Sequence, residues 1–149
     1  MKVSVIGLGY VGLPLTLALS KYFNVIGFDK DIERVKNLNK RKDSNNELKL
    51  INIKFKIKFT YNQLNLSNSD FFIVTVPTPI YKNKVPDLRN IINATKIISK
   101  FIKKNNIVIY ESTVYPGVTE DICGKIITNH TKLVLNKDFF LGYSPERIN

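Results

Sequence analysis

The sequence contains almost none of the residues that build disulfide or metal frameworks. Its 149 residues include one cysteine, one histidine and no tryptophan. A single cysteine, Cys123, excludes an internal disulfide and suits a cytoplasmic location, where thiols stay reduced. We interpret Cys123 as a small core residue within a helix. The only histidine, His130, lies in a polar segment without metal-ligand spacing around it, so we predict a surface loop residue and no metal site.

Long apolar runs are also missing. No uninterrupted stretch approaches the roughly 20 residues that a membrane-spanning helix needs, so we expect no membrane partner. The mostly apolar segment between Lys2 and Leu19 raises the alternative of a secretory signal. That alternative explains neither the strand predicted after it nor the acidic residue that ends this strand, Asp29.

Acidic residues are scarce. Asp and Glu together number 12 against 23 Lys and Arg, which gives a formal net charge of +11. The lysines are spread along the chain without a basic stripe or interleaved aromatic residues, so we expect no nucleic-acid partner. A diffuse positive charge instead suits anionic ligands such as nucleotides, which it attracts over a long range.

The segment from Lys2 to Asp29 organises the rest of the chain. Its pattern predicts a strand, a glycine-rich turn, a helix and a second strand, at residues 2–6, 7–12, 13–22 and 24–28. Gly7, Gly9 and Gly12 have the spacing of a dinucleotide-binding loop: the first makes the tight turn, the second admits a pyrophosphate, and the third allows close packing. The phosphates would lie at the helix N-terminus, where free N–H groups favour negative charge.

Asp29 ends the second strand of this segment. Its carboxylate can accept hydrogen bonds from an adenosine ribose and would repel a 2′-phosphate, which favours NAD over NADP. A short helix is predicted from Asp31 to Leu38, with Arg34 on its first turn. The Arg34 guanidinium could lie over the adenine or could be solvated on the helix surface. The alternative for the whole segment is a structural turn in another kind of α/β protein.

The rest of the chain alternates strands and helices. Strands are expected at 51–59, 71–76, 107–110 and 139–143, a short crossing segment at 61–69, and helices at 86–106 and 118–128. Alternating lysines in 51–59 indicate a strand at or near a sheet edge, which we favour over a nucleic-acid-binding row. Six strands with helices between most of them predict an α/β fold: a doubly wound Rossmann-type parallel sheet with strand order 3-2-1-4-5-6 and right-handed crossovers.

This strand order opens several loops on one rim of the sheet, the carboxyl ends of its strands. Doubly wound sheets bind ligands at that rim. The segments expected to converge there are Gly7–Gly12, Asp29, Thr75–Thr78, Ser112–Thr113 and Glu146.

Four motifs give the chain a family resemblance. They are Gly-Leu-Gly-Tyr-Val-Gly-Leu-Pro-Leu (7–15), Val-Pro-Thr-Pro (76–79), Tyr-Glu-Ser-Thr-Val-Tyr-Pro-Gly (110–117) and Gly-Tyr-Ser-Pro-Glu-Arg-Ile-Asn (142–149). In this order, over essentially the whole chain, they resemble the N-terminal NAD-binding domain of the UDP-glucose/GDP-mannose dehydrogenase family, the nucleotide-sugar 6-dehydrogenases. The last two are most similar to the branch that oxidises UDP-N-acetylhexosamines to uronic acids for surface polysaccharides.

The resemblance implies a reaction and a set of site residues. Two NAD molecules would each accept a hydride as the sugar C6 alcohol becomes a carboxylate, through a thioester on a cysteine. The adenosine diphosphate of NAD would contact Gly7, Gly9, Tyr10, Val11, Gly12, Asp29 and Arg34. The nicotinamide would contact Thr75, Val76, Pro77, Thr78, Ser112, Thr113 and Val114.

The resemblance also assigns catalytic and substrate roles. Thr113 would help to order a water, Glu146 would act as acid or base at the thioester step, and Glu146 and Arg147 would contact the UDP-sugar. From the residues alone, Glu146 could equally be a solvated turn residue.

One departure from the family pattern matters. The family's catalytic cysteine and its helper lysine belong to a later stretch with the sugar-binding domain, and Cys123 does not match that motif. The 149 residues therefore resemble the cofactor half of an enzyme, without the central dimerisation helix and the C-terminal UDP-sugar-binding domain. We expect NAD binding without turnover by this chain alone, and a homodimer built through other regions.

Other functions stay open from the sequence. The substrate could be UDP-glucose or GDP-mannose, or the chain could belong to a β-hydroxyacid-type dehydrogenase that shares the glycine loop. A non-catalytic domain that senses NAD or NADH is an alternative from another class.

Overall fold

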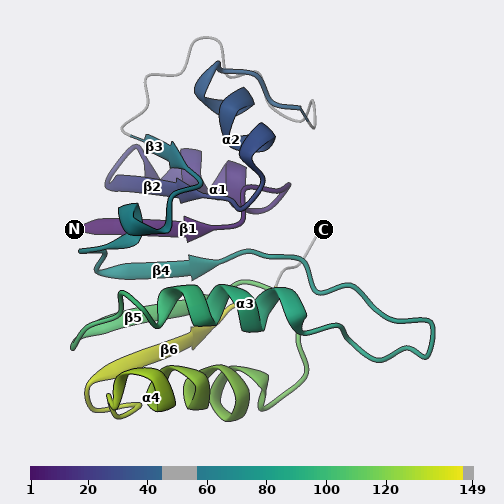
Figure 1. Ribbon diagram of the computed structural model, residues 1–149, viewed down its shortest axis with the longest axis vertical. Helices are drawn as coiled ribbons and strands as arrows, with labels where there is room; N and C mark the ends of the chain where they lie inside the picture. Colours follow the sequence, from purple (N-terminus) through teal and green to yellow (C-terminus); the bar gives the residue numbers. More distant parts are fainter. Residues whose placement is uncertain (45–56, 146–149) are drawn as a thin grey trace.

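The computed structural model describes residues 1–44 and 57–145. Within them six strands form one sheet with the order β3-β2-β1-β4-β5-β6, and every neighbouring pair is parallel (Figure 1). The strands are β1 Lys2–Ile6, β2 Asn24–Phe28, β3 Ile57–Thr60, β4 Phe71–Val74, β5 Asn106–Tyr110 and β6 Phe139–Tyr143. The predicted α/β class and strand order are confirmed.

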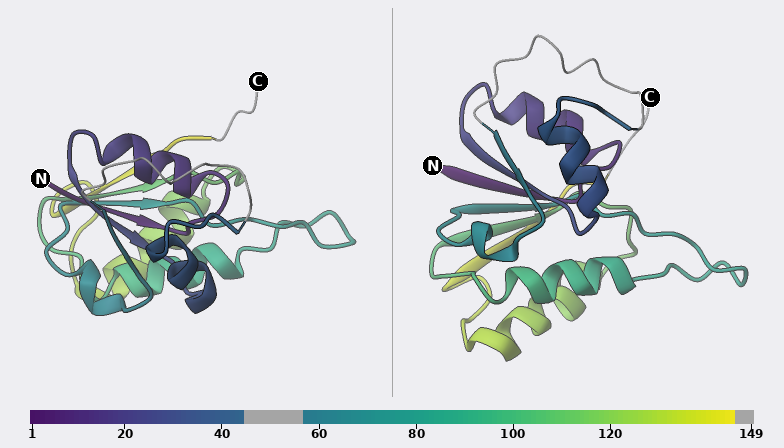
Figure 2. Two further views of the ribbon diagram at one scale, coloured as in Figure 1. Left: turned by 90° about the horizontal axis from the view of Figure 1, so that it is seen from above. Right: turned by 45° about the horizontal axis from the view of Figure 1, so that its top comes forward.

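Helical segments connect the strands. They are α1 Gly12–Leu19, α2 Ile32–Asn39, the 3₁₀ turn η1 Gln63–Leu66, α3 Arg89–Ile98, the π-helical η2 Val118–Gly124 and α4 Lys125–Thr131. Figure 2 shows α1 on one face of the sheet and α3 and α4 on the other. The connection after β1 runs over one face of the sheet, and the connection after β4 runs over the other face. The strand order therefore reverses between these two adjacent strands, at their carboxyl ends.

Three strands have the predicted bounds, whereas β4 ends at Val74 rather than Val76 and α3 ends at Ile98 rather than near Asn106. β1, β2 and β6 have the predicted bounds, and β3 is an edge strand in its described part; residues 51–56 of that predicted strand lie outside the described residues. α3 begins at Arg89 rather than near Pro86, because the Asp87 carboxylate binds the Arg89 guanidinium and backbone N–H. His130 is exposed, but it lies inside α4 and not in a loop, since that helix continues until Lys132 takes a left-handed conformation.

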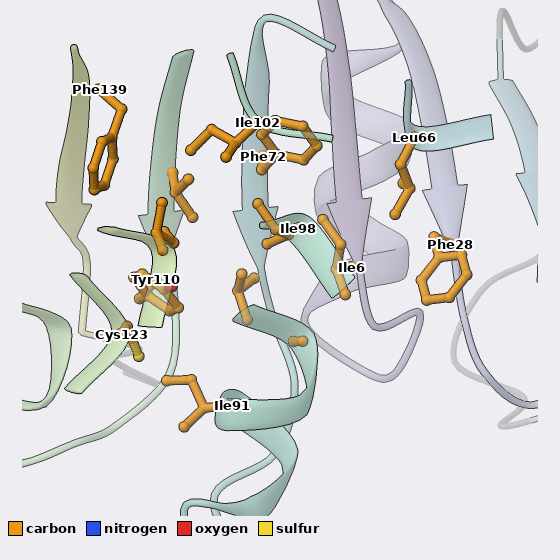
Figure 3. Packing of buried hydrophobic residues seen from close by; sticks show 14 of the residues in the cluster. Ile6, Phe28, Leu66, Phe72, Ile91, Ile98, Ile102, Tyr110, Cys123 and Phe139 are labelled. Atoms are coloured by element: carbon orange, nitrogen blue, oxygen red, sulfur yellow. The ribbon is translucent and has the colours of Figure 1, made fainter. Parts of the chain in front are cut away.

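The larger part of the core lies between the sheet and the helices α3 and α4 (Figure 3). Phe72, Tyr110 and Phe139 are its largest fully buried side chains. The buried Tyr110 hydroxyl lies 2.8 Å from the hydroxyl of Thr95. Cys123 is fully buried among these residues, which confirms its interpretation as a core residue.

The opposite face of the sheet is covered over only part of its width. Val3 and Val5 of β1 are buried where α1 packs. Phe71, Ile107 and Phe140 continue that face side by side across β4, β5 and β6. Phe71 and Ile107 are half-buried and Phe140 is 41% exposed. This apolar strip of β4 to β6 therefore lacks a covering helix within the described residues.

In the described ranges, no helix combines the length and the apolar character that crossing a membrane requires.

Candidate functional site

Two hollows lie at the carboxyl ends of β1 and β4. The first has a volume of about 290 Å³ and is lined by β1, the end of β2, the segment after β4 and α3. The second has a volume of about 510 Å³ and is lined by the glycine loop and the segments after β4 and β5. Both share Gly9, Thr75, Val76 and Pro77. A ligand that extends from one hollow to the other would therefore pass beside Gly9 and the segment after β4.

The first and third glycines of the loop are required by its own packing. Gly7 has a φ of +99°, which side chains other than glycine rarely adopt, and a Cβ there would lie 3.1 Å from the Thr75 carbonyl oxygen. A Cβ at Gly12 would lie 1.8 Å from the Gly7 carbonyl oxygen. These two positions bring the start of α1 against β1, as predicted for the motif.

The second glycine faces open space. A Cβ at Gly9 would meet no atom within 4 Å, so nothing in the described fold itself requires glycine there. The N-cap of α1, Val11, makes no side-chain cap, and no acidic residue lies in the first turn of this helix. An open backbone beside an uncapped helix N-terminus fits a bound pyrophosphate.

Asp29 lies at the end of β2 and lines the first hollow. Its Oδ2 accepts a hydrogen bond of 2.7 Å from the Leu8 backbone N–H, and its Oδ1 accepts one of 2.9 Å from the Asp31 backbone N–H. Each carboxylate oxygen can accept further hydrogen bonds, so Asp29 can still receive ribose hydroxyls. The carboxylate thus ties the glycine loop to β2 at the edge of the hollow.

Arg34 lies on the first turn of α2, as predicted, but its side chain is buried. Its guanidinium is buried under the glycine loop, where Nε donates to the Leu8 carbonyl oxygen at 2.9 Å and Nη1 donates to Asp43 at 2.5 Å. Arg34 lines neither hollow. Its burial corrects the interpretation of a solvated helix arginine, and its contact with the adenine stays a prediction.

Hydroxyl groups connect the other segments that line the second hollow by hydrogen bonds. Thr75 Oγ1 donates to the Gly7 carbonyl oxygen at 2.7 Å, and Ser112 Oγ donates to the Val76 carbonyl oxygen at 2.8 Å. Thr78 Oγ1 donates to the Thr113 carbonyl oxygen at 2.8 Å. These hydroxyls donate to backbone carbonyl oxygens and so hold the loops after β4 and β5 together.

The other expected residues are distributed around the second hollow. Tyr10 and Val11 line it, and so does Thr113, whose side chain is exposed. Val114 does not line it; it packs against the core, and its carbonyl oxygen accepts a hydrogen bond of 3.3 Å from the Tyr143 hydroxyl. Glu146 and Arg147 lie outside the described residues.

Several lining residues were not among the expected site residues. α3 contributes Asn90, Asn93, Ala94 and Ile97 to the first hollow, and the loop after β2 contributes Lys30. The sequence did contain a signal for the residues of α3: two asparagines at helical spacing lie on a face that otherwise carries apolar residues. Glu111 was also missed as a lining residue of the second hollow.

No group of three or more His, Cys, Asp or Glu side chains in residues 1–44 and 57–145 could hold a metal ion.

Relatives of known type match the chain over its whole length. A UDP-N-acetyl-D-glucosamine 6-dehydrogenase from Pseudomonas aeruginosa is 48% identical over 151 aligned positions, which cover 100% of this chain and 36% of the relative. Protein CapL from Staphylococcus aureus is 45% identical over 99% of this chain and 35% of its own length. The chain thus spans about a third of the length of these relatives.

Solved structures have the same fold. The UDP-D-ManNAc dehydrogenase from Pyrococcus horikoshii superposes with a TM-score of 0.86 at 30% identity, over 100% of this chain and 37% of that one. A ternary complex of GDP-mannose dehydrogenase from Pseudomonas aeruginosa superposes with a TM-score of 0.85 at 25% identity, again over 100% of this chain and 37% of that one.

A family model matches as well. It describes the NAD binding domain of the UDP-glucose/GDP-mannose dehydrogenase family and covers residues 1–149. Its match agrees with the glycine loop, Asp29 and the two hollows described above. The chain belongs to the UDP-glucose/GDP-mannose dehydrogenase family, of which it contains the NAD binding domain.

Proposed function

We propose that this chain is the NAD-binding part of an enzyme that oxidises the C6 alcohol of a UDP-N-acetylhexosamine to the uronic acid for surface polysaccharide synthesis. The observation that carries the proposal is the meeting of two hollows at Gly9, beside an uncapped helix N-terminus. The choice of substrate is supported by relatives at 42% to 48% identity that are named UDP-N-acetyl-D-glucosamine 6-dehydrogenases.

Each hollow would hold a different part of the cofactor. The first, with Asp29 at its edge, would hold the adenosine, and Gly9 with the start of α1 would hold the pyrophosphate. The second, lined by Thr75 to Thr78 and by Ser112 and Thr113, would hold the nicotinamide. Bound NAD supplies the hydride acceptor, and the conversion of an alcohol to a carboxylate requires two such transfers.

Two residues of this chain are proposed to act on the substrate side. Thr113 is exposed at the second hollow, where its hydroxyl would help to order the water that attacks the thioester. Glu146 would act as acid or base in that step, and Arg147 would contact the UDP-sugar. In support, β6 ends at the same rim as β5, where the Ser144 backbone N–H donates to the Tyr110 carbonyl oxygen at 3.0 Å.

Other parts of the enzyme would lie in a longer protein. The family's catalytic cysteine and lysine, the UDP-sugar-binding domain and the homodimer contacts are proposed to lie outside these 149 residues. The apolar strip of Phe71, Ile107 and Phe140 supports this proposal, because a half-exposed sheet face of an α/β fold is normally covered. A cytoplasmic location fits the single, buried cysteine.

Two alternative functions compete with the proposal. A UDP-glucose or GDP-mannose substrate would use the same fold, since the GDP-mannose enzyme superposes as well as the UDP-D-ManNAc enzyme does. A non-catalytic NAD(H) sensor would use the same cofactor site without a sugar.

Two measurements test the function. Calorimetric titration of the 149-residue chain should show binding of NAD and much weaker binding of NADP, and no NADH should form with UDP-N-acetylglucosamine. A chimera that joins this chain to the remaining two-thirds of the Pseudomonas aeruginosa relative should oxidise UDP-N-acetylglucosamine faster than UDP-glucose or GDP-mannose. A chain that binds no NAD, or turnover by the chain alone, would contradict the proposal.

A further inference from the structure

A third hollow lies away from the two hollows of the cofactor site, between η1 and the end of α3. It has a volume of about 540 Å³ and shares no lining residue with the other two. Because α3 runs antiparallel to the strands, its last turn lies near the end of the sheet where β1 begins (Figure 1). We call this depression the η1 hollow. It is lined by Tyr61, Asn62, Gln63, Leu64, Lys100 and Phe101.

Three lysines around the η1 hollow donate to neutral amide side chains rather than to carboxylates. In each case the acceptor belongs to the segment 63–68, in η1 or directly after it. Among the described residues, none of the three ammonium groups forms an ion pair, so their charges are not neutralised locally. The pairs, with their N–O distances, are Lys58 and Asn65 (2.7 Å), Lys100 and Gln63 (3.3 Å), and Lys103 and Asn68 (2.7 Å).

The sequence around the η1 hollow has no acidic residue to balance these lysines. Asp and Glu are absent from residues 57–69, which contain η1, and from residues 88–110, which contain α3. The acid that follows the first of these segments, Asp70, accepts a hydrogen bond of 2.8 Å from the Lys2 backbone N–H. Burial and the positive charge of Lys58 lower the pKa of the Lys2 ammonium, as expected where cations outnumber acids. This surface therefore favours an anionic partner.

Stabilisation of the end of α3 does not by itself account for these lysines. Cations stabilise a helix C-terminus when they lie close to its free carbonyl groups. α3 ends at Ile98, and Lys100 and Lys103 come shortly after it. The ammonium groups of both lysines nevertheless donate to side chains in η1 and after it. These cations therefore belong to the surface around the η1 hollow.

The walls of the η1 hollow are partly apolar. Leu64 is 69% exposed, Tyr61 is 51% exposed and Phe101 is half-buried. Covering such side chains with a partner is favourable, and protein interfaces commonly place an apolar anchor in a hollow within a polar rim. An apolar hollow among three cations thus suits a ligand that is both acidic and apolar.

We propose that the η1 hollow is a docking site for an acidic peptide segment of a second protein. One large apolar side chain of that segment would fill the hollow, and its carboxylates would pair with Lys58, Lys100 and Lys103. Charge complementarity supports this occupant, because three cations around one hollow match carboxylates that flank one anchor residue. A nucleic acid would instead require cations in a row along its phosphate backbone.

The location favours a separate protein over another part of a longer chain. A sugar has to reach the nicotinamide at the carboxyl ends of the strands, so a sugar-binding domain is expected at that rim. The η1 hollow lies at the opposite end of α3 and leaves the cofactor site accessible. The inference adds a partner to this chain and goes beyond the proposed function.

The test uses two synthetic peptides and the isotope-labelled 149-residue chain. One peptide is Gly-Glu-Asp-Glu-Trp-Glu-Asp-Glu-Gly, and the other has alanine in place of tryptophan. NMR titration with the tryptophan peptide should shift the backbone amide resonances of Leu64, Lys100 and Phe101. The alanine peptide should bind at the same place but more weakly, because it leaves the hollow unfilled.

Three variants assign the binding to the η1 hollow. Lys100→Glu should raise the dissociation constant of the tryptophan peptide at least roughly tenfold, because it places a carboxylate against carboxylates. Lys21→Glu is the matched control: this lysine is exposed just after α1, the change in net charge is the same, and the affinity should not change. Leu64→Ser should weaken binding of the tryptophan peptide and leave that of the alanine peptide unchanged.

Each contrary result overturns the inference. Absence of peptide binding would do so, as would equal losses in Lys100→Glu and Lys21→Glu, which would show attraction by net charge alone. A single-stranded oligothymidine that shifts the same amide resonances at lower concentration than the tryptophan peptide would indicate a nucleic-acid site instead. Calorimetric titration with NAD should give the same affinity for Lys100→Glu and the unchanged chain. The docking site and the proposed cofactor site can therefore fail independently.

Discussion

A Cβ atom at position 12 would lie 1.8 Å from the carbonyl oxygen of Gly7, whereas one at position 9 would meet no atom within 4 Å. Gly7 and Gly12 are therefore in contact through their backbones at the start of α1. The glycines of one motif thus meet different requirements: close packing at positions 7 and 12, and open space at position 9, where we propose that the pyrophosphate binds.

Gly12→Ala and Gly9→Ala should separate these requirements. Gly12→Ala should lower the free energy of unfolding by about 3 kcal/mol or more, because the methyl group overlaps backbone that cannot move aside. Gly9→Ala should change stability by less than about 1 kcal/mol. It should weaken NAD binding at least roughly tenfold, because its methyl group would occupy the proposed pyrophosphate position. Urea denaturation and calorimetric titration measure the two effects. Normal NAD affinity in Gly9→Ala would contradict the assignment of this position.

Asp29→Asn should reduce the discrimination between NAD and NADP. The change removes the negative charge that would repel a 2′-phosphate and weakens the charge-assisted hydrogen bond to the Leu8 N–H. NAD affinity should fall roughly tenfold, while NADP affinity should stay the same or rise. The matched control is Asp31→Asn, because asparagine caps a helix as well as aspartate and Asp31 already caps α2. An unaltered NAD-to-NADP ratio in Asp29→Asn would rule out charge repulsion as the basis of selectivity.

Alkaline pH should destabilise the fold through Cys123. Burial raises the pKa of the Cys123 thiol, so the folded chain keeps a proton that the unfolded chain releases. This contribution to stability is complete below the unfolded thiol pKa of about 8.5 and is lost as the pH rises toward the folded pKa. Urea denaturation between neutral and alkaline pH should show a decline that is smaller in Cys123→Ala. Equal pH dependence of both proteins would contradict this role.

Low pH should destabilise the fold through Asp87, whereas Cys123 acts at alkaline pH. Hydrogen bonds from Arg89 hold the pKa of the Asp87 carboxyl well below its usual range. Its contribution is present above the unfolded carboxyl pKa of about 3.9 and is lost as the pH falls through the lower, folded pKa. Asp87→Asn should therefore lose less stability than the unchanged chain on acidification, as measured by denaturation at several pH values. Glu33→Gln, in an exposed pair with Lys36, is the control and should behave like the unchanged chain.

The local sequence pattern was sufficient for most of the fold. The run from Lys2 to Asp29 carries period-two apolar residues, three spaced glycines and a helical apolar run, and each feature acts over a few residues. The structure has β1 and β2 at the predicted bounds, and the roles of Gly7 and Gly12 follow from the spacing of the motif. Strand order followed from the doubly wound pattern of alternating strands and helices.

Tertiary structure alone decided where the long side chains of the site lie. Arg34 could be placed on a helix from its spacing, but its partners Leu8 and Asp43 come from other segments, and the burial that favours these contacts exists only after packing. The asparagines of α3 reach the first hollow for the same reason, since a helix face acquires a ligand only when the neighbouring strands end beside it. Periodicity encodes which face of an element is buried, and only the packed chain determines what that face meets.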